Sequence, residues 1–263
     1  MERASKTQLK EIRELLRNKK KRDASGLFIV EGSKIISDIS GKGGSIRSIV
    51  VSDNFTEKNG QFIEGMEGKN IEVFSAGNKD LEKACSLRNP EGVLAVVDKP
   101  KLDKGLYDFF GEGTMLLLDN VQDPGNVGTI IRLAAAFQVL AVILYGECAD
   151  EFNPKTVRAS SGAIMSVPTY KVNDSDIDRL KKSGMKLLAA CPSEEKDKKI
   201  TRLLSENIPK IIAFGSEGKG VSDKISKKAD DILYIPIADE VESLNVASAA
   251  AITLYEIGRG EQP

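Results

Sequence analysis

The sequence predicts an α/β protein made of two compact units, with a mostly parallel sheet in the second unit. At 263 residues, the chain is longer than the roughly 100 to 200 residues of a usual single domain. Short apolar runs alternate with segments of helical periodicity in both halves. A polar stretch punctuated by Pro and Gly lies between the halves, as a linker would. We therefore expect a first domain at residues 1–100, a linker at 101–113 and a second domain at 114–263.

The first half opens with a basic segment that has the periodicity of an amphipathic helix. Apolar side chains recur at helical spacing over residues 5–18, and the tract Lys19–Arg22 follows. Residues 1–22 contain nine Lys or Arg and three Glu, a local charge of +6 in a chain of net charge −1. Two interpretations stay open: a solvated helix face, or a surface that contacts phosphates, because polyanion binding depends on local charge.

Apolar runs predict the strands of each half. In the first half, short buried strands are expected, with helical patterns near 33–40 and 78–86 between some of them. In the second half, the runs alternate with helix-like segments, which predicts a mostly parallel sheet covered by helices. The runs are residues 27–32, 46–52, 71–76 and 92–98 in the first half, and 114–119, 140–146, 185–191, 210–215 and 232–237 in the second.

Composition excludes several classes of protein. A hydrophobic content of 41% and a charged content of 29% are typical of a globular protein with a real core. No apolar run approaches the roughly 18 residues that cross a membrane, and the amino terminus lacks a secretory signal, so we expect a cytoplasmic protein. Cys85, Cys148 and Cys191 are single and widely spaced, and the chain has no His, so neither a disulfide framework nor a metal site is expected.

Polar clusters follow three strands of the predicted parallel sheet, where α/β proteins bind ligands. The first is NVQDPGNVGTIIRLAAAF at residues 120–137. We expect a helix from Val127 to Phe137 with Asn126 at its cap, a role that by itself would explain this residue. Arg132 stands among apolar residues on that helix, so it is expected to need an anionic or polar partner.

The second cluster is the glycine-rich stretch IIAFGSEGKGVSD at residues 211–223. Its spacing fits neither a P-loop, which requires G-x-x-x-x-G-K-[ST], nor the G-x-G-x-x-G fingerprint of dinucleotide-binding folds. Glu217 would also repel phosphates, so the loop points to a ligand with hydroxyls, amines or positive charge. An ordinary glycine turn is the alternative.

The third cluster is YIPIADEVESLNVASAAAITLYEI at residues 234–257. A short acidic loop follows the strand, and Ser243, Leu244 and Asn245 lead into a helix rich in small residues that let another backbone approach closely. The alternative is a tightly packed carboxyl-terminal helix that is capped by Ser243 and binds nothing.

Together, the three clusters closely resemble the three ordered motifs of the SpoU (TrmH-like) RNA ribose 2'-O-methyltransferases. The segment RASSGAIMSVP (158–168) resembles the stretch between the first two motifs, and SGLFIVEGSKII (25–36) more weakly resembles the start of an L30e-like substrate domain. The resemblance implies an α/β knot, in which a deep trefoil knot forms near the carboxyl terminus, and a homodimer. It also implies S-adenosylmethionine as cofactor and RNA as substrate, with ribosomal RNA favoured over tRNA.

The resemblance also assigns roles to residues. Gly215, Ile235 and Leu244 match cofactor-contacting positions, with Ala190, Ile237 and Ala247 as neighbours. The catalytic and substrate-positioning set is matched by Asn126, Arg132, Glu217, Ser243 and Asn245.

Methyl transfer to a ribose hydroxyl is a direct displacement that needs alignment and proton removal. The resemblance assigns Arg132 to the proton, but a guanidinium is a poor base because its pKa exceeds about 12. The alternative is that Arg132 binds a phosphate and stabilises the developing alkoxide.

Two rival functions remain. One is a non-catalytic RNA-binding or ribosome-assembly protein, which measured S-adenosylmethionine binding would exclude. The other is a phosphate-binding NTPase, which the spacing of the glycine-rich loop disfavours.

Overall fold

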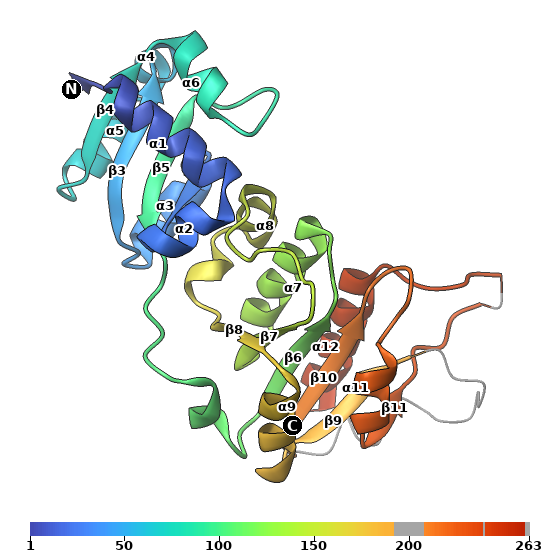
Figure 1. The fold of residues 1–263 in the computed structure, drawn as a ribbon. Coiled ribbons are helices and arrows are strands. Elements are labelled where there is room, and N and C mark those ends of the chain that lie inside the picture. The colour runs from blue at the N-terminus through green and yellow to red at the C-terminus, as the bar shows by residue number, and fades with distance from the viewer. Residues whose placement is uncertain (192–207, 239, 261–263) are drawn as a thin grey trace. The chain divides into compact units, whose positions relative to one another are not determined.

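The computed structural model describes residues 1–191, 208–238 and 240–260, and the chain divides into two compact units (Figure 1). Unit 1 contains Met1–Lys101 together with the later segment Phe152–Met165, and unit 2 contains the rest. Among the described residues, every helix is too short or too polar to cross a membrane. The domain boundaries that we expect from the sequence stay a prediction, and the return of Phe152–Met165 to unit 1 was not expected.

Unit 1 is built on a five-stranded mixed sheet. Its strands are β1 (Glu2–Arg3), β2 (Leu27–Glu31), β3 (Ile46–Ser52), β4 (Glu72–Ala76) and β5 (Val93–Asp98), in the order β1-β4-β3-β5-β2. The four strands predicted from apolar runs are confirmed. Because β5 is antiparallel to β2 and β3, and β3 is parallel to β4, the carboxyl ends of β2, β3 and β4 lie at one edge.

Helices cover both faces of this sheet. They are α1 (Lys6–Arg17), α2 (Lys19–Ser25), α3 (Ser33–Gly41), α4 (Asp53–Lys58), α5 (Gly60–Glu67) and α6 (Asn78–Ala84). Helices α1 and α6 pack their apolar side chains into one core with β2, β3 and β5. Helices α4 and α5 were not expected from the sequence.

The basic amino-terminal segment is part of this core. A capping box of Ser5 and Gln8 starts α1, and Leu15 is fully buried on its inner face. Asn18 ends α1, so the tract Lys19–Arg22 forms the start of a separate helix. Arg22 is buried and donates to the carbonyl oxygens of Leu15 (2.6 Å) and Leu16 (3.3 Å). Arg22 therefore closes the end of α1, whereas Lys19 and Lys20 are exposed, so both interpretations of the basic segment stay open for these lysines.

The segment Phe152–Met165 packs within unit 1. It forms α8 (Pro154–Ser160) and the short helix η2 (Ala163–Met165). The ring of Phe152 lies 5.0 Å from that of Phe28, and Arg158 pairs with the buried carboxylate of Glu31. Arg158 also donates to Ser86 Oγ at 2.7 Å. This ion pair gives Glu31 the partner that a buried charge needs.

Unit 2 contains a six-stranded sheet in which every strand pair is parallel. Its strands are β6 (Thr114–Asp119), β7 (Ala141–Tyr145), β8 (Thr169–Val172), β9 (Lys186–Ala190), β10 (Lys210–Gly215) and β11 (Asp231–Leu233), in the order β11-β9-β10-β6-β7-β8. The predicted α/β fold with a parallel sheet is confirmed. Strand β11 ends four residues before the expected Ile237, since Pro236 has no N–H to donate to a ladder.

Helices lie on both faces of this sheet. Helix α7 (Pro124–Ala136) packs against α12 (Val246–Gly260), and both contact the sheet (Figure 1). The other face is covered by α9 (Asp174–Lys182), α11 (Asp223–Lys228) and the short helix η1 (Leu106–Phe109). Phe109 is only 5% exposed in this core, so part of the predicted linker is packed structure.

Candidate active site

The predicted site residues gather at the carboxyl edge of the unit 2 sheet. Gly215 is the register partner of Asp119 on the neighbouring strand, and Asp119 is in turn the partner of Tyr145. On the other side of β10, Ala190 ends β9 opposite Leu233 of β11. The segments that follow β6, β10 and β11 therefore all start from one edge, as the strand pattern predicts.

Asn126 lies inside the first turn of α7. The helix begins at Pro124, and its cap is Asp123, whose Oδ1 accepts from the backbone N–H of Asn126 at 3.0 Å. The prediction that Asn126 caps the helix is therefore wrong by three residues. Because the side chain of Asp123 caps the helix, the side chain of Asn126 is not needed as a cap and can form hydrogen bonds elsewhere.

Side chains from the three motifs form a continuous hydrogen-bonded chain. Asn126 Nδ2 donates to Glu217 Oε1, and Asn126 Oδ1 accepts from Asn245 Nδ2 at 3.0 Å. We call Asn245, Asn126 and Glu217 the polar chain. Glu217 lies 91 positions and Asn245 lies 119 positions from Asn126 in the sequence, so only the fold brings the three side chains together.

The polar chain is anchored on a helix. Asn245 Oδ1 accepts from the backbone N–H groups of Ala247 (2.9 Å) and Ser248 (3.3 Å), so Asn245 caps α12. The alternative cap Ser243 is wrong; it is exposed and not hydrogen-bonded to the polar chain. Because the Asn245 carbonyl is fixed by the helix, its amide must donate outward, and the direction of each later bond follows. The polar chain thus holds the exposed carboxylate of Glu217 through its hydrogen bond with Asn126.

Arg132 lies on α7 with an exposed side chain. Among the residues that the structure describes, it forms no hydrogen bond or ion pair. The anionic or polar partner that we expect for Arg132 is not among the described residues and stays a prediction, and exposure spares its charge the cost of burial. Its guanidinium is therefore available to a ligand from solution.

The glycine-rich loop closes tightly on itself. Gly220 N–H donates to Ser216 O at 2.8 Å, and Gly220 has a φ of +64°. A Cβ atom on Gly215 would overlap with the backbone of Gly220 and Val221, whereas one on Gly218 would meet nothing within 4 Å. Gly215 is therefore required by the shape of the loop.

Sequence reasoning missed Asp119, which ties the glycine loop to the sheet. Asp119 is 1% exposed, and its carboxylate accepts from Ser222 N–H (2.6 Å) and Asn120 Nδ2 (2.7 Å). Asn120 Oδ1 in turn accepts from Glu147 N–H at 2.8 Å. The single Asp at the end of the apolar run TMLLLD was the available signal, since a carboxylate buried there must accept hydrogen bonds from several donors.

The remaining predicted cofactor positions are apolar residues at the end of β9, after β11 and at the start of α12, and we call them, together with the glycine-rich loop, the cofactor surface. Ala247 is buried, and the other four positions are half-buried: Ala190, Ile235, Ile237 and Leu244.

In the described residues, no group of three or more His, Cys, Asp or Glu side chains could hold a metal. Burial raises the pKa of Cys148 and of Cys191, which keeps both thiols protonated and unreactive.

Comparisons with known proteins agree with this geometry. The profile of the SpoU rRNA methylase family matches residues 113–255, and that of the MRM3-like substrate binding domain matches residues 6–95. The 23S rRNA (guanosine(2553)-2'-O)-methyltransferase RlmP of Bacillus subtilis is 32% identical over 244 residues, which is 92% of each chain.

Two solved structures are similar over nearly their whole length. The AdoMet-bound rRNA methyltransferase from Sinorhizobium meliloti has a TM-score of 0.80 and 28% identity, covering 100% of this chain and 99% of that one. The SpoU methyltransferase AviRb from Streptomyces viridochromogenes, in complex with AdoMet, has a TM-score of 0.81 and 27% identity, covering 97% and 98%. The chain therefore belongs to the SpoU rRNA methylase family.

Proposed function

We propose that this chain is an RNA ribose 2'-O-methyltransferase that uses S-adenosylmethionine and acts on ribosomal RNA. The observation that carries the proposal is the polar chain, which joins all three motifs at the carboxyl edge of the sheet. The similar RlmP is named for 2'-O-methylation of 23S rRNA, and two similar structures contain AdoMet. A protein that only binds RNA would not need such a preorganised cluster beside a cofactor surface.

The cofactor surface fits S-adenosylmethionine by its chemistry. It combines loop backbone, half-buried apolar side chains and the carboxylate of Glu217, and lacks a phosphate-binding motif. When bound, the cofactor supplies an activated methyl group. Gly215, Ile235 and Leu244 would hold it, with Ala190, Ile237 and Ala247 as less direct neighbours.

The polar chain and Arg132 would act on the RNA side. We assign Arg132 to the phosphate next to the target ribose and to the developing alkoxide, because its side chain is an exposed cation and the family resemblance matches it to the catalytic set. Asn126, Glu217 and Asn245 would fix the ribose hydroxyl in line for the displacement, with Ser243 beside them. Alignment of this kind contributes up to about 7 to 11 kcal/mol in the best intramolecular cases.

The proposal includes a homodimer and a metal-free reaction. Phe137 at the end of α7, and Ile252 and Tyr255 on α12, are exposed large apolar side chains on two helices that pack together. Such a patch supports a self-association surface.

Methyl transfer from a sulfonium needs no Lewis acid, and an enzyme of ribosomal RNA would work in the cytoplasm where ribosomes assemble. The trefoil knot and the L30e-like form of unit 1 stay expectations from the family.

Methyl transfer to defined RNA tests the function directly. Purified protein, labelled S-adenosylmethionine and unmodified 23S rRNA or bulk tRNA are incubated with a chelator, and 2'-O-methyl sites are mapped. We expect one methylated nucleotide in the rRNA and none in the tRNA. Methylated tRNA would instead identify tRNA as the substrate. If calorimetry detected no binding of S-adenosylmethionine, only the non-catalytic alternative would remain.

A further inference from the structure

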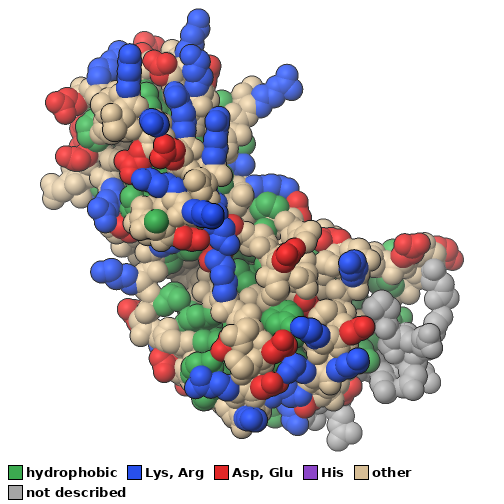
Figure 2. Space-filling model, viewed as in Figure 1, with side chains coloured by type: hydrophobic (Ala, Val, Ile, Leu, Met, Phe, Trp, Pro, Cys, Tyr) green, Lys and Arg blue, Asp and Glu red, His purple; other side chains and the backbone are tan. Residues whose placement is uncertain are grey.

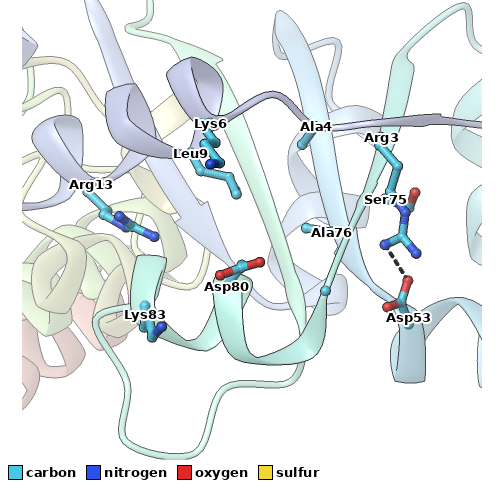
Figure 3. A pocket seen from close by; sticks show the side chains of 11 residues that line it. Arg3, Ala4, Lys6, Leu9, Arg13, Asp53, Ser75, Ala76, Asp80 and Lys83 are labelled. Atoms are coloured by element: carbon cyan, nitrogen blue, oxygen red, sulfur yellow. Dashed lines mark hydrogen bonds and ion pairs between the residues drawn. The ribbon is translucent and has the colours of Figure 1, made fainter.

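Unit 1 contains a cavity far in sequence from the polar chain. It has a volume of about 640 Å³ and lies between α1, the end of β4 and α6 (Figure 3). Lys6 and Arg13 line it from α1, Lys83 and Asp80 from α6, and Ser75 to Gly77 from the strand end. Drug-sized and nucleotide-sized ligands bind in pockets of about 300 to 1,000 Å³, so the cavity has a suitable size.

Three cations of this pocket have no partner in the described part of the chain. Lys6, Arg13 and Lys83 form no ion pair there, in contrast to Arg3, which binds Asp53 at 2.7 Å on the pocket rim. The Nε of Arg13 is buried and has no hydrogen-bond acceptor. A buried donor without an acceptor destabilises a protein by about 1 to 3 kcal/mol, so this atom points to a ligand that supplies one.

The pocket also contains an acid, which narrows the ligand class. Asp80 lies between the cations and the strand end in Figure 3, and no described side chain pairs with its carboxylate. Cations alone would suit any phosphate, but Asp80 would repel a second phosphate group. The pocket therefore suits a ligand with one anionic group and, a few ångströms away, an N–H donor. A nucleotide whose base carries an amino group has both.

We propose that this pocket binds one unstacked nucleotide of the substrate RNA, with its phosphate on Arg13 and Lys83 and an amino group of its base on Asp80. Single-stranded RNA is recognised through bases that leave the stack, and a carboxylate accepts from the cytosine amino group. The inference rests on the proposed function only for the identity of the polyanion.

Charges around the pocket favour RNA over a free nucleotide. Lys10, Arg17, Lys19 and Lys20 are exposed on α1 and α2, and Figure 2 shows many Lys and Arg side chains on the face of unit 1 that it presents. A longer phosphate chain can contact these cations, whereas a mononucleotide cannot. We therefore expect decacytidine to bind at least about tenfold more tightly than cytidine monophosphate.

Matched charge reversals test the pocket in the full-length protein. Arg13→Glu with Lys83→Glu changes two pocket cations, and Lys34→Glu with Lys42→Glu changes, by the same charge, two exposed cations in and just after α3 that do not line the pocket. We expect the pocket pair to weaken decacytidine binding by at least about tenfold and to flatten the salt slope by about 1.4, while the control pair changes affinity by about threefold or less. Equal losses in both pairs would overturn the pocket and leave a diffuse basic surface.

Base preference tests Asp80. The wild-type protein should prefer decacytidine over decauridine by about fivefold or more, and Asp80→Ala should remove that preference without lowering decauridine affinity. An unchanged preference would refute the role of Asp80. Unfolding temperatures check that each variant folds, and Arg13→Gln with Lys83→Gln replaces the reversals if they do not.

Cofactor titrations separate this inference from the proposed function. Pocket variants should bind S-adenosylmethionine normally and methylate 23S rRNA with a raised KM and an unchanged kcat. If the wild-type protein methylates rRNA and the variants do so with an unchanged KM, the pocket is wrong and the function stands. If the wild-type protein methylates nothing while the pocket variants still lose oligonucleotide binding, the function is wrong and the pocket stands.

Discussion

The polar chain of unit 2 and the pocket of unit 1 use polar side chains in opposite ways. In the polar chain, each group is bonded to the next and the last is fixed by helix backbone. In the pocket, Lys6, Arg13 and Lys83 stand without partners in the described part of the chain. Chemistry requires groups held in a fixed direction, whereas polyanion binding depends mainly on the number of charges. Small geometric changes should therefore damage unit 2 far more than unit 1.

The largest effect is expected from the shape of the glycine loop. Gly215→Ala places a Cβ atom inside the backbone of Gly220 and Val221, so the loop must open. We expect the affinity for S-adenosylmethionine to fall at least about a hundredfold, with methylation lost as a result. Calorimetry of the folded variant measures this effect.

Gly218→Ala is the matched control in the same loop. A Cβ atom there meets nothing within 4 Å, so cofactor affinity should stay within about threefold of wild type. If both variants lost the same cofactor affinity, the loop would tolerate no side chain at either position, and the close approach of Gly215 to Gly220 would not explain the loss.

Removal of the Arg132 cation should affect chemistry and spare the cofactor. Arg132→Ala is expected to lower kcat by about 100-fold to 1,000-fold, the usual loss of one group that stabilises a developing oxyanion. S-adenosylmethionine affinity should stay within a few-fold. Arg132→Lys keeps the charge but not the planar fork, so an intermediate rate is expected. Loss of cofactor binding in folded Arg132→Ala would contradict our assignment.

The direction of the polar chain can be tested without loss of the α12 cap. Asn245→Asp keeps an oxygen for the N–H groups of Ala247 and Ser248 but cannot donate to Asn126. We expect kcat to fall by about tenfold at nearly unchanged stability. Asn245→Ala should show the same kcat loss and also lose about 1 kcal/mol of stability. A wild-type kcat in Asn245→Asp would mean that Asn245 is only a cap.

Much of the fold of both units could be predicted from the sequence. Buried parallel strands are continuous apolar runs, so β6 and β10 were predicted with the bounds that the structure has. Strand β8 was missed because its residues are mostly half-buried and lack an apolar run. Helix α5 was missed because Gly60 and Gly65 weaken its helical pattern.

The site was predictable as motifs but not as contacts. The three clusters follow strands whose carboxyl ends share one edge, so their proximity could be inferred. Which side chain caps which helix could not, because Asp123 and Asn126, like Ser243 and Asn245, are all good cap residues. The burial of Arg22 was also hidden, since it reaches the carbonyl groups in the last turn of α1 only because a second helix begins after Asn18. That burial, with Leu15 in the core, makes deletion of residues 1–22 a poor test of RNA binding, because unit 1 would lose its core helix.

The smallest effect concerns the support beneath the catalytic edge. Tyr145 is 8% exposed, is the register partner of Asp119, and its hydroxyl donates to Asp174 at 2.9 Å. Burial, and then the hydrogen bond and charge of Asp174, raise the pKa of Tyr145 to about 12. Tyr145→Phe should lower the free energy of unfolding by about 1 kcal/mol at pH 8.

The pH dependence of that loss has a definite sign. Since the folded pKa lies above the ordinary value of 10.0, the protonated phenol stabilises the fold fully below about pH 10, and this stabilisation is lost as pH rises towards 12. The gap between wild type and Tyr145→Phe should therefore shrink above about pH 10 in urea titrations. Tyr234→Phe, at a half-buried tyrosine of unit 2, serves as the control. A gap that stays constant through this range would show that neither burial nor Asp174 raises the pKa of Tyr145 on folding, and a gap near zero at pH 8 would show that its hydroxyl contributes nothing beyond the packing of the ring.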